Sequence, residues 1–268
     1  MSASGFVYRR AKSLVGPIAA LAVLVSVATF ATAAPPKPTL EYNFDASKDN
    51  LTTPGGIRDL SGNKYNGTEF SAGAGTSFGP GHLPTTTAIY LLGDDDVGSG
   101  LGATGAAGGT GIDTGIDTGS VGIDSGPFTV MAWVNRFSFK GDHMVFGTMN
   151  NAAPDLHLGF RKSQAYSGFW GNDSGVIVHI GIYEWHHFAV SHDGKSPGVQ
   201  AIYIDGVPVS KEANHNPYVG SGVDLTIGHT FGNGGAFCGA IEHPRVYGGV
   251  ALMDDQIAAD AADLPIPP

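Results

Sequence analysis

The sequence predicts an all-β protein, an antiparallel two-sheet β-sandwich that ends in a short C-terminal helix. Three observations lead to this fold class. Most of the chain consists of short segments rich in β-branched and aromatic residues, turn residues separate these segments, and one segment near the C-terminus has helical character. Many short strands with frequent turns are typical of an antiparallel sandwich.

The first 34 residues have the composition of a signal peptide. Positive charges at Arg9, Arg10 and Lys12 precede an apolar run over residues 14–31, and small residues follow where a signal peptidase would cut. We therefore expect a secreted, extracellular or cell-surface protein, with an uncleaved membrane anchor as the alternative. Residues 35–38 then form a stiff proline-rich linker.

Composition restricts the partners of the rest of the chain. The net charge is −10, and no run of basic residues follows the leader. Since phosphate binding needs clustered lysine and arginine, we expect no nucleic-acid partner. Once the leader is cleaved, we expect no contact with a membrane. The lone cysteine, Cys238, excludes an intrachain disulfide and is expected to be buried within a strand, with an intermolecular link as the alternative.

Glycine is concentrated in one low-complexity stretch, residues 93–126. It contains a tandem tetrapeptide, Ile112-Asp113-Thr114-Gly115 followed by Ile116-Asp117-Thr118-Gly119. Two copies are too few to build a stacked β-helix, so we expect a solvent-exposed insert on the surface of the domain. A calcium-binding acidic loop is the alternative interpretation.

Strand-forming residues mark the expected strands in order along the chain: residues 39–45, 87–92, 128–134, 184–190, 199–204, 207–210, 225–228 and 235–247. Residues 128–134 are apolar at almost every position, which predicts a strand buried on both faces in the middle of a sheet. Asp205-Gly206 predicts a tight hairpin turn, because such a turn needs positive φ. Residues 253–262 form the expected helix, where Asp254 and Asp255 offset the positive end of the dipole.

Six segments follow one another in an informative order: Asp59-Leu60-Ser61-Gly62-Asn63 with Asn66-Gly67-Thr68, Phe128-Thr129-Val130-Met131-Ala132-Trp133-Val134, Leu156-His157-Leu158-Gly159-Phe160-Arg161 with Gly168-Phe169-Trp170-Gly171-Asn172-Asp173, Trp185-His186-His187-Phe188-Ala189-Val190, Ile202-Tyr203-Ile204-Asp205-Gly206, and Gly239-Ala240-Ile241-Glu242-His243-Pro244-Arg245-Val246-Tyr247. Together they resemble bacterial, secreted laminin-G-like domains of the concanavalin A-like lectin/glucanase superfamily. The resemblance covers residues 39–262, with a short tail at residues 263–268. It implies a concanavalin A-like jelly roll that serves as a recognition module.

The chain departs from that family pattern at one position. Glu242 stands where these domains usually have aspartate, and Pro244 follows it in the expected strand. Because proline cannot donate a ladder hydrogen bond, we expect an edge or a bulge here.

No catalytic residue is predicted. The glutamates are isolated in sequence, without the alternating carboxylates that sandwich glucanases carry on one strand. His186 and His187 are adjacent, so on a strand they face opposite sides and cannot chelate a metal together. No zinc-hydrolase or serine-hydrolase motif occurs. A glycan-cleaving enzyme with carboxylates from separate strands is the alternative.

Four residues are candidate calcium ligands. Asp59 and Asn63 lie on a tight loop that offers the hard oxygen ligands calcium prefers. Asp45 and Glu242 join them because the first and last strands of this fold tend to be neighbours. A simple hydrogen-bonded turn at Asp59 is the alternative.

Five residues are candidate glycan ligands. Trp170 can stack on a sugar ring, while Arg161, Asn172 and Asp173 supply planar polar groups. Tyr218, in a polar loop, is a second candidate for stacking. The alternative is that Trp170 packs in the core of the domain.

The sequence therefore predicts a secreted, non-catalytic recognition module that binds a glycan or a cell-surface or matrix protein, with calcium as a candidate cofactor. A structural or adhesive component of an extracellular matrix or surface layer is the second interpretation. Fold alone does not name the ligand, because the loops of a sandwich set its specificity.

Overall fold

The structure, a computed structural model, describes residues 36–71, 76–93, 110–148, 155–169, 172–220, 222–230 and 235–267. The predicted signal peptide, residues 94–109 of the glycine-rich segment and Trp170 lie outside these residues. Within the described part of the chain, no helix is long and apolar enough to cross a membrane.

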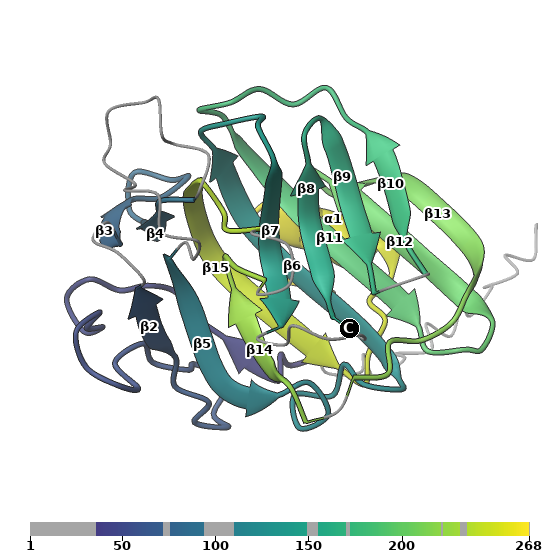
Figure 1. Ribbon diagram of the computed structural model, residues 1–268, viewed down its shortest axis with the longest axis horizontal. Coiled ribbons are helices and arrows are strands. Elements are labelled where there is room, and N and C mark those ends of the chain that lie inside the picture. The colour runs from purple at the N-terminus through teal and green to yellow at the C-terminus, as the bar shows by residue number, and fades with distance from the viewer. Residues whose placement is uncertain are drawn as a thin grey trace, which may run out of the picture. The chain divides into compact units, whose positions relative to one another are not determined.

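Two antiparallel sheets face each other and form a sandwich (Figure 1). The eight-stranded sheet has the order β13 (Val207–His215), β12 (Gly198–Ile204), β11 (Trp185–Asp193), β6 (Pro127–Arg136), β15 (Gly239–Gly248), β4 (Thr87–Leu91) and β3 (Ser77–Pro80), and β1 (Leu40–Glu41) also pairs with β15. The seven-stranded sheet has the order β10 (Ser174–Ile177), β9 (Gln164–Gly168), β8 (His157–Arg161), β7 (Asp142–Thr148), β14 (Asp224–Ile227), β5 (Thr110–Asp117) and β2 (Thr68–Ser71). The predicted fold class is confirmed.

The main core lies between the two sheets. In β6, Phe128, Val130 and Val134 face the opposing sheet, where they meet side chains such as Phe146 and Phe160. Each of these side chains is fully or almost fully buried, and burial of one side chain of this size stabilises the fold by about 1.5–3 kcal/mol. The alternate residues of β6 face outward, as the period of a strand requires.

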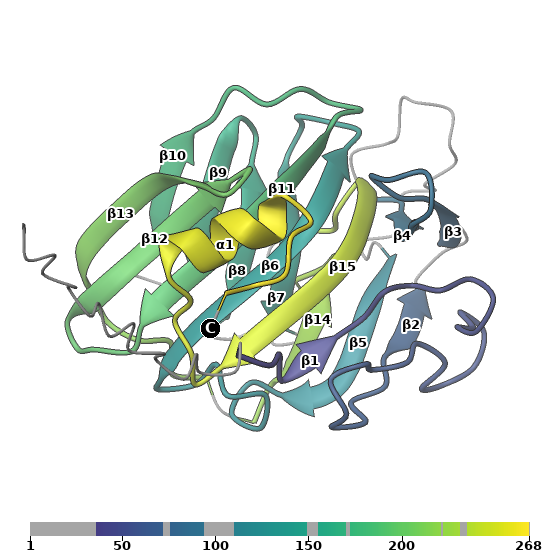
Figure 2. The same cartoon turned by 180° about the vertical axis from the view of Figure 1, so that it is seen from behind.

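The single described helix, α1 (Asp254–Ala261), lies across the outer face of the eight-stranded sheet (Figure 2). A second apolar cluster fills the space between helix and sheet: Met131, Ala189, Ala201, Tyr203, Tyr247, Leu252 and Ile257. Asp260 fixes the helix, because its buried carboxylate pairs with Arg245 and lies 2.9 Å from His187 Nε2. Residues 128–134 are thus buried on both faces where the helix covers them, although Trp133 stays partly exposed.

The prediction that residues 93–126 form an exposed insert is wrong for residues 110–126. Thr110–Asp117 is strand β5, hydrogen-bonded between β14 and β2, and Ile112 is fully buried. Gly111 permits this packing, because a Cβ there would lie 2.8 Å from the Phe70 ring. Beyond the strand, Val121 also enters the core. The glycine-rich composition hid a strand in which Gly111 admits a close neighbour.

The predicted bulge in β15 is confirmed. Glu242 pairs with Trp133 and Arg245 pairs with Met131, so β15 has one residue more than β6 between these two pairs. His243, with φ 48°, and Pro244 form the bulge. Pro244 therefore occupies a position where a missing N–H costs no ladder hydrogen bond.

His143, in β7, is fully buried and both of its ring nitrogens make hydrogen bonds. Nε2 donates to the Lys140 carbonyl at 2.7 Å, and Nδ1 accepts the N–H of Cys238 at 3.1 Å. Cys238 is buried as predicted, but it lies directly before β15 and not within a strand. A second proton on Nδ1 would break the bond from Cys238. Burial, reinforced by the charge of Arg136, lowers the pKa of His143 to about 4.

The tandem tetrapeptide gives a direct test of β5. Ile112→Ala should lower the free energy of unfolding by about 2–5 kcal/mol, because it empties a fully buried site. Ile116→Ala, at the same place in the second copy, should cost much less because Ile116 is only partly buried. Urea unfolding measures both. Equal, small losses for the two variants would contradict the assignment of a buried strand.

The buried His143 predicts a pH dependence of stability. Since its pKa is lowered in the folded state, the unfolded chain binds the extra proton from about pH 6.5 downward while the folded chain stays neutral until about pH 4. The free energy of unfolding should therefore fall on acidification through this window, by up to about 1.4 kcal/mol per pH unit. His143→Gln should flatten that slope, whereas His179→Gln at an exposed position should leave it unchanged; an unaltered slope in His143→Gln would refute the assignment.

Candidate functional site

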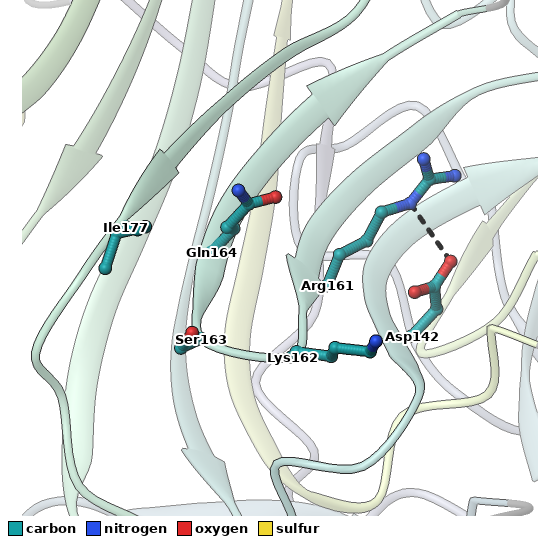
Figure 3. Close-up of a pocket in the computed structure, with 6 residues that line it drawn as sticks. All are labelled: Asp142, Arg161, Lys162, Ser163, Gln164 and Ile177. Atoms are coloured by element: carbon teal, nitrogen blue, oxygen red, sulfur yellow. Dashed lines mark ion pairs between the residues drawn. The ribbon is translucent and has the colours of Figure 1, made fainter.

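A pocket of about 420 Å³ lies on the outer face of the seven-stranded sheet, at the turn between β8 and β9 (Figure 3). Six residues line it: Asp142, Arg161, Lys162, Ser163, Gln164 and Ile177. Leu158 and Phe160 of β8 face the core, so Arg161 at the end of the strand faces away from it. Ile177 is 62% exposed and supplies an apolar surface beside these polar groups.

Arg161 is held in place on two sides. Its Nε lies 3.0 Å from Asp142 Oδ2, and its guanidinium carbon lies 3.9 Å from the centre of the Tyr166 ring (the ion pair is dashed in Figure 3). Tyr166 has room on its sheet surface because its partners on the adjacent strands are Gly159 and Gly175. Among the described residues, no hydrogen-bond partner occupies the two Nη atoms of Arg161.

The remaining predicted glycan ligands are only partly brought together. Asp173 lies beside the Tyr166 hydroxyl, since both would lie within 3 Å of a Cβ added at Gly168. Asp173 and Arg161 thus approach the same tyrosine. The Asn172 side chain is turned toward a different loop, where Nδ2 donates to the Asn216 carbonyl at 2.5 Å. Trp170 lies outside the described residues.

The prediction that Tyr218 contacts a ligand is wrong. Its side chain is fully buried in the main core, where its ring packs edge-on against Phe169 with centroids 5.7 Å apart. Its polar neighbours in sequence suggested a surface loop. The connection from β13 to β14 instead carries one aromatic side chain inward.

The loop at Asp59 is a hydrogen-bonded turn, which was the alternative to a calcium site. Asp59 Oδ1 accepts the N–H groups of Glu41 and Ser61, and Oδ2 accepts the Ser61 hydroxyl and the Tyr65 N–H. Asn63 Nδ2 donates to the Thr39 carbonyl at 2.9 Å. Both carboxylate oxygens of Asp59 are therefore already used as acceptors within the turn.

Asp45 and Glu242 do lie together, as expected for neighbours of the first and last strands. They line a pocket of about 370 Å³ with Asn43, Thr85, Thr86, Thr87 and His243. The Asn43 amide oxygen is buried and has no hydrogen-bond partner among the described residues. A hydrogen bond from Ser47 lowers the pKa of Asp45 to about 2, so its carboxylate is ionised at neutral pH.

This pocket does not hold a ready-made set of metal ligands. Glu242 Oε2 accepts hydrogen bonds from His82, at 2.6 Å from the backbone N and 2.8 Å from Nδ1. Across the described ranges, no three His, Cys, Asp or Glu side chains are grouped to hold a metal ion. The candidate calcium ligands that remain are the side-chain oxygen atoms of Asn43, Asp45 and Glu242.

Sequence reasoning missed an aromatic surface on the eight-stranded sheet, formed by Tyr90, Phe137, Tyr183 and Trp185. The Phe137 ring centre lies 5.2 Å from that of Tyr183, with the planes 26° apart, and 5.9 Å from that of Tyr90. Tyr183 is 62% exposed, and the other three are partly exposed. These residues come from three separate segments, so no local pattern marks them as a group.

Asn135 lies among these rings. Its partners on the adjacent strands are Trp185 on one side and Ala240 on the other, and Ala240 pairs in turn with Tyr90. The Asn135 side chain faces outward because Val134 faces the core. The residue is 9% exposed, and its Oδ1 has no hydrogen-bond partner among the described residues. An unpaired buried acceptor costs roughly 1–3 kcal/mol, which a ligand hydroxyl would recover.

The histidines near this surface have structural partners. His82 stacks on Trp133 with ring centres 4.1 Å apart, and its two nitrogens contact Glu242 and Asp263. His186 and His187 face opposite sides, as predicted. His186 Nδ1 lies 2.9 Å from Asp205 Oδ2, and this hydrogen bond raises the pKa of His186.

A laminin-G-type family model, described as the concanavalin A-like lectin/glucanases superfamily, matches residues 108–258, more than half of the chain. The chain belongs to this superfamily. The two-sheet sandwich and its single terminal helix agree with the family fold, and the family resemblance predicted from six sequence segments is confirmed. No curated protein matches the chain significantly.

Several solved structures share the fold of this superfamily member. Domain 4 of AbnA, an extracellular arabinanase from Geobacillus stearothermophilus, solved with arabinotriose, is 22% identical with a TM-score of 0.61, over 85% of this chain and 100% of that domain. The binding domain of Paraclostridial Mosquitocidal Protein 1 is 13% identical with a TM-score of 0.55, over 85% of this chain and 52% of that one. The binding domain of botulinum neurotoxin DC, solved with SialylT, is 11% identical with a TM-score of 0.56, over 85% and 51%. The chain thus spans about half of the toxin binding domains, and at these identities the likeness shows the fold.

Proposed function

We propose that this protein is an exported, non-catalytic recognition module that binds a glycan. The observation that carries the proposal is the aromatic surface of Tyr90, Phe137, Tyr183 and Trp185. Sugar rings present apolar C–H faces, and exposed aromatic rings are the side chains that offer large, rigid apolar area with little loss of conformational entropy. Phe137 lies against both Tyr90 and Tyr183, Trp185 lies nearby on the same sheet, and all four side chains are at least partly exposed.

Asn135 adds the polar element that glycan recognition needs. Binding sites for small molecules combine apolar walls with a few placed hydrogen-bonding groups. The unpaired amide oxygen of Asn135 lies next to Trp185 in the sheet, and rotation of the amide presents it to a hydroxyl group of a sugar stacked on the rings. The same amide can donate through Nδ2, so it suits the paired donors and acceptors of a carbohydrate.

The structural relatives support the same class of function. Domain 4 of AbnA was solved with arabinotriose, and the binding domain of botulinum neurotoxin DC was solved with SialylT. The same botulinum neurotoxin DC binding domain was also solved with rat synaptotagmin II, which supports a protein partner as the second candidate. The signal-like leader and the absence of a nucleic-acid-binding basic run fit an extracellular partner.

Calcium is part of this proposal as a cofactor with a structural role. The oxygen donors that fit it are the unpaired amide oxygen of Asn43 and the carboxylates of Asp45 and Glu242, because calcium takes carboxylate and amide oxygens. Bound there, an ion would tie the start of the domain to β15, in competition with Lys48 and Arg58 for Asp45 and with His82 for Glu242. Specificity for the glycan would remain with the aromatic surface.

Glycan binding can be tested on an array that includes arabino-oligosaccharides, with the chain from residue 35 onward. Trp185→Ala and Tyr183→Ala should each weaken binding of the best hit by about tenfold or more, because each removes a stacking face worth about 1.4 kcal/mol. Val207→Ala, at a 61% exposed position on β13, is the matched control and should bind normally. Unchanged affinity in folded Trp185→Ala protein, or no hit for the parent protein, would sink the proposal.

Calcium binding can be tested by thermal unfolding with calcium and with chelator. Calcium at about 100 times its dissociation constant should raise the free energy of unfolding by about 2.7 kcal/mol and the melting temperature by about 5–11 °C. Asn43→Ala should reduce that shift. Asp59→Asn should keep it, because Asp59 lies in a hydrogen-bonded turn. A parent protein that melts at the same temperature in both buffers has no calcium site.

A further inference from the structure

We propose that the pocket at the β8–β9 turn is a second ligand site, and that it binds the carboxylate or sulfate group of an acidic sugar. This inference goes beyond the aromatic surface, which suits neutral sugar faces and lies on the other sheet. It depends on three features of the described residues: the held guanidinium of Arg161, the concentration of positive charge around the turn, and the mixed lining of the pocket.

Arg161 is prepared to bind an anion. The ion pair with Asp142 uses Nε, and the stack on Tyr166 fixes the plane of the guanidinium. The two Nη atoms keep their N–H groups available, since no described residue accepts from them. Two parallel N–H donors match the two oxygens of a carboxylate or sulfate, and a fixed fork loses little entropy when it binds.

The support beneath Arg161 is specific to this part of the sheet. A larger residue at Gly168 would collide with the Tyr166 hydroxyl and with Asp173. A Cβ at Gly159 would lie 2.3 Å from the His143 carbonyl oxygen. Burial raises the pKa of Tyr166, so the ring stays neutral and does not add a competing charge beneath the arginine.

Positive charge gathers at this turn in an acidic protein. The chain has a net charge of −10. Yet the segments that meet at this turn carry four cations, Arg136, Lys140, Arg161 and Lys162, against the one carboxylate of Asp142. Backbone contacts tie them together: the Lys162 N–H donates to the Gly141 carbonyl, and the Arg136 Nη2 donates to the Lys162 carbonyl at 2.6 Å. Such local charge attracts an anion despite the negative net charge.

Arg136 contributes an uncompensated charge behind the turn. It is 1% exposed, and its Nε and Nη1 have no hydrogen-bond partner in the described part of the chain. Its guanidinium lies over the Phe160 ring, 4.6 Å from the centroid. Burial lowers the pKa of Arg136 to about 10, which still leaves it charged at neutral pH. A buried cation without a carboxylate partner raises the potential of its surroundings.

The rest of the lining suits a sugar and not a bare ion. Ser163 and Gln164 offer hydrogen bonds to hydroxyl groups, and the exposed Ile177 offers an apolar contact for ring C–H groups. Lys162 lies on the same turn and adds a flexible cation (Figure 3). The volume, about 420 Å³, lies within the range of small-ligand pockets.

Calorimetric titration with three probes tests this site: trigalacturonic acid, its neutral methyl ester, and a neocarrabiose sulfate that has no carboxylate. The parent protein should bind at least one acidic probe about tenfold or more tightly than the ester. That preference should shrink as salt is raised, because partly exposed charges are screened. Binding of trigalacturonic acid alone assigns a carboxylate, and binding of the sulfated probe alone assigns a sulfate.

Three variants locate the effect. Arg161→Gln should remove the preference for the acidic probe, and Arg161→Lys should retain part of it because the charge remains while the fork is lost. Lys195→Gln, at a 77% exposed lysine on another loop, is the matched control and should not change it. Equal binding of acid and ester by the parent protein, or an intact preference in folded Arg161→Gln protein, would overturn the inference.

The two proposals fail separately. Binding of a neutral glycan that is lost in Trp185→Ala, without any preference for acidic probes, would leave the proposed function and remove the second site. A preference for acidic probes that depends on Arg161, with no binding that depends on Trp185, would leave the second site and remove the aromatic surface as the glycan platform.

Discussion

The bulge at His243 and Pro244 in β15 is the constraint on which the rest of the structure depends. Side chains alternate along a strand, so without the extra residue Arg245 would point into the core. With it, Glu242 and Arg245 both face outward on the same sheet. Arg245 then holds Asp260 of α1, and Glu242 accepts two hydrogen bonds from His82, whose other nitrogen contacts the tail. Helix and tail are thus attached on either side of one irregularity.

The fold was predictable because its signals are local. Pro244 indicates a bulge because proline has no N–H to donate to the ladder. The apolar run that includes Val130 indicates a central strand. The glycine-rich segment was not predictable in the same way. Its second half contributes Ile112 to the core, but the surrounding glycines carry no side chains from which a period of two could be read. Composition indicated a loop, and close packing against Phe70 explains why glycine is needed there instead.

The candidate sites were less predictable because they join distant segments. Arg161 was identified for its chemistry, but Tyr166, which holds it, was not, since only the registers of β9 with β8 and β10 place glycines beside that ring. Tyr183 and Phe137 are far apart in sequence and meet only through the sheet. Tyr218 shows the opposite error, because a polar local context concealed a side chain that is fully buried. A sequence shows which residue types are present, but the side of the sheet on which each side chain lies depends on the pairing register of the strands.

Three acidic side chains of the described residues serve the fold itself, which fits the proposal of a recognition module. A hydrolase needs a carboxylate that is free to exchange protons with substrate. Here Asp260 pairs with Arg245, Asp205 with His186, and Glu242 with His82. Each of these contacts fixes an element of the fold, so a change of protonation would loosen the structure. The aromatic rings and the Arg161 fork are different, because their exposed faces hold no other element in place. Binding can therefore use them without disturbing the fold that positions them.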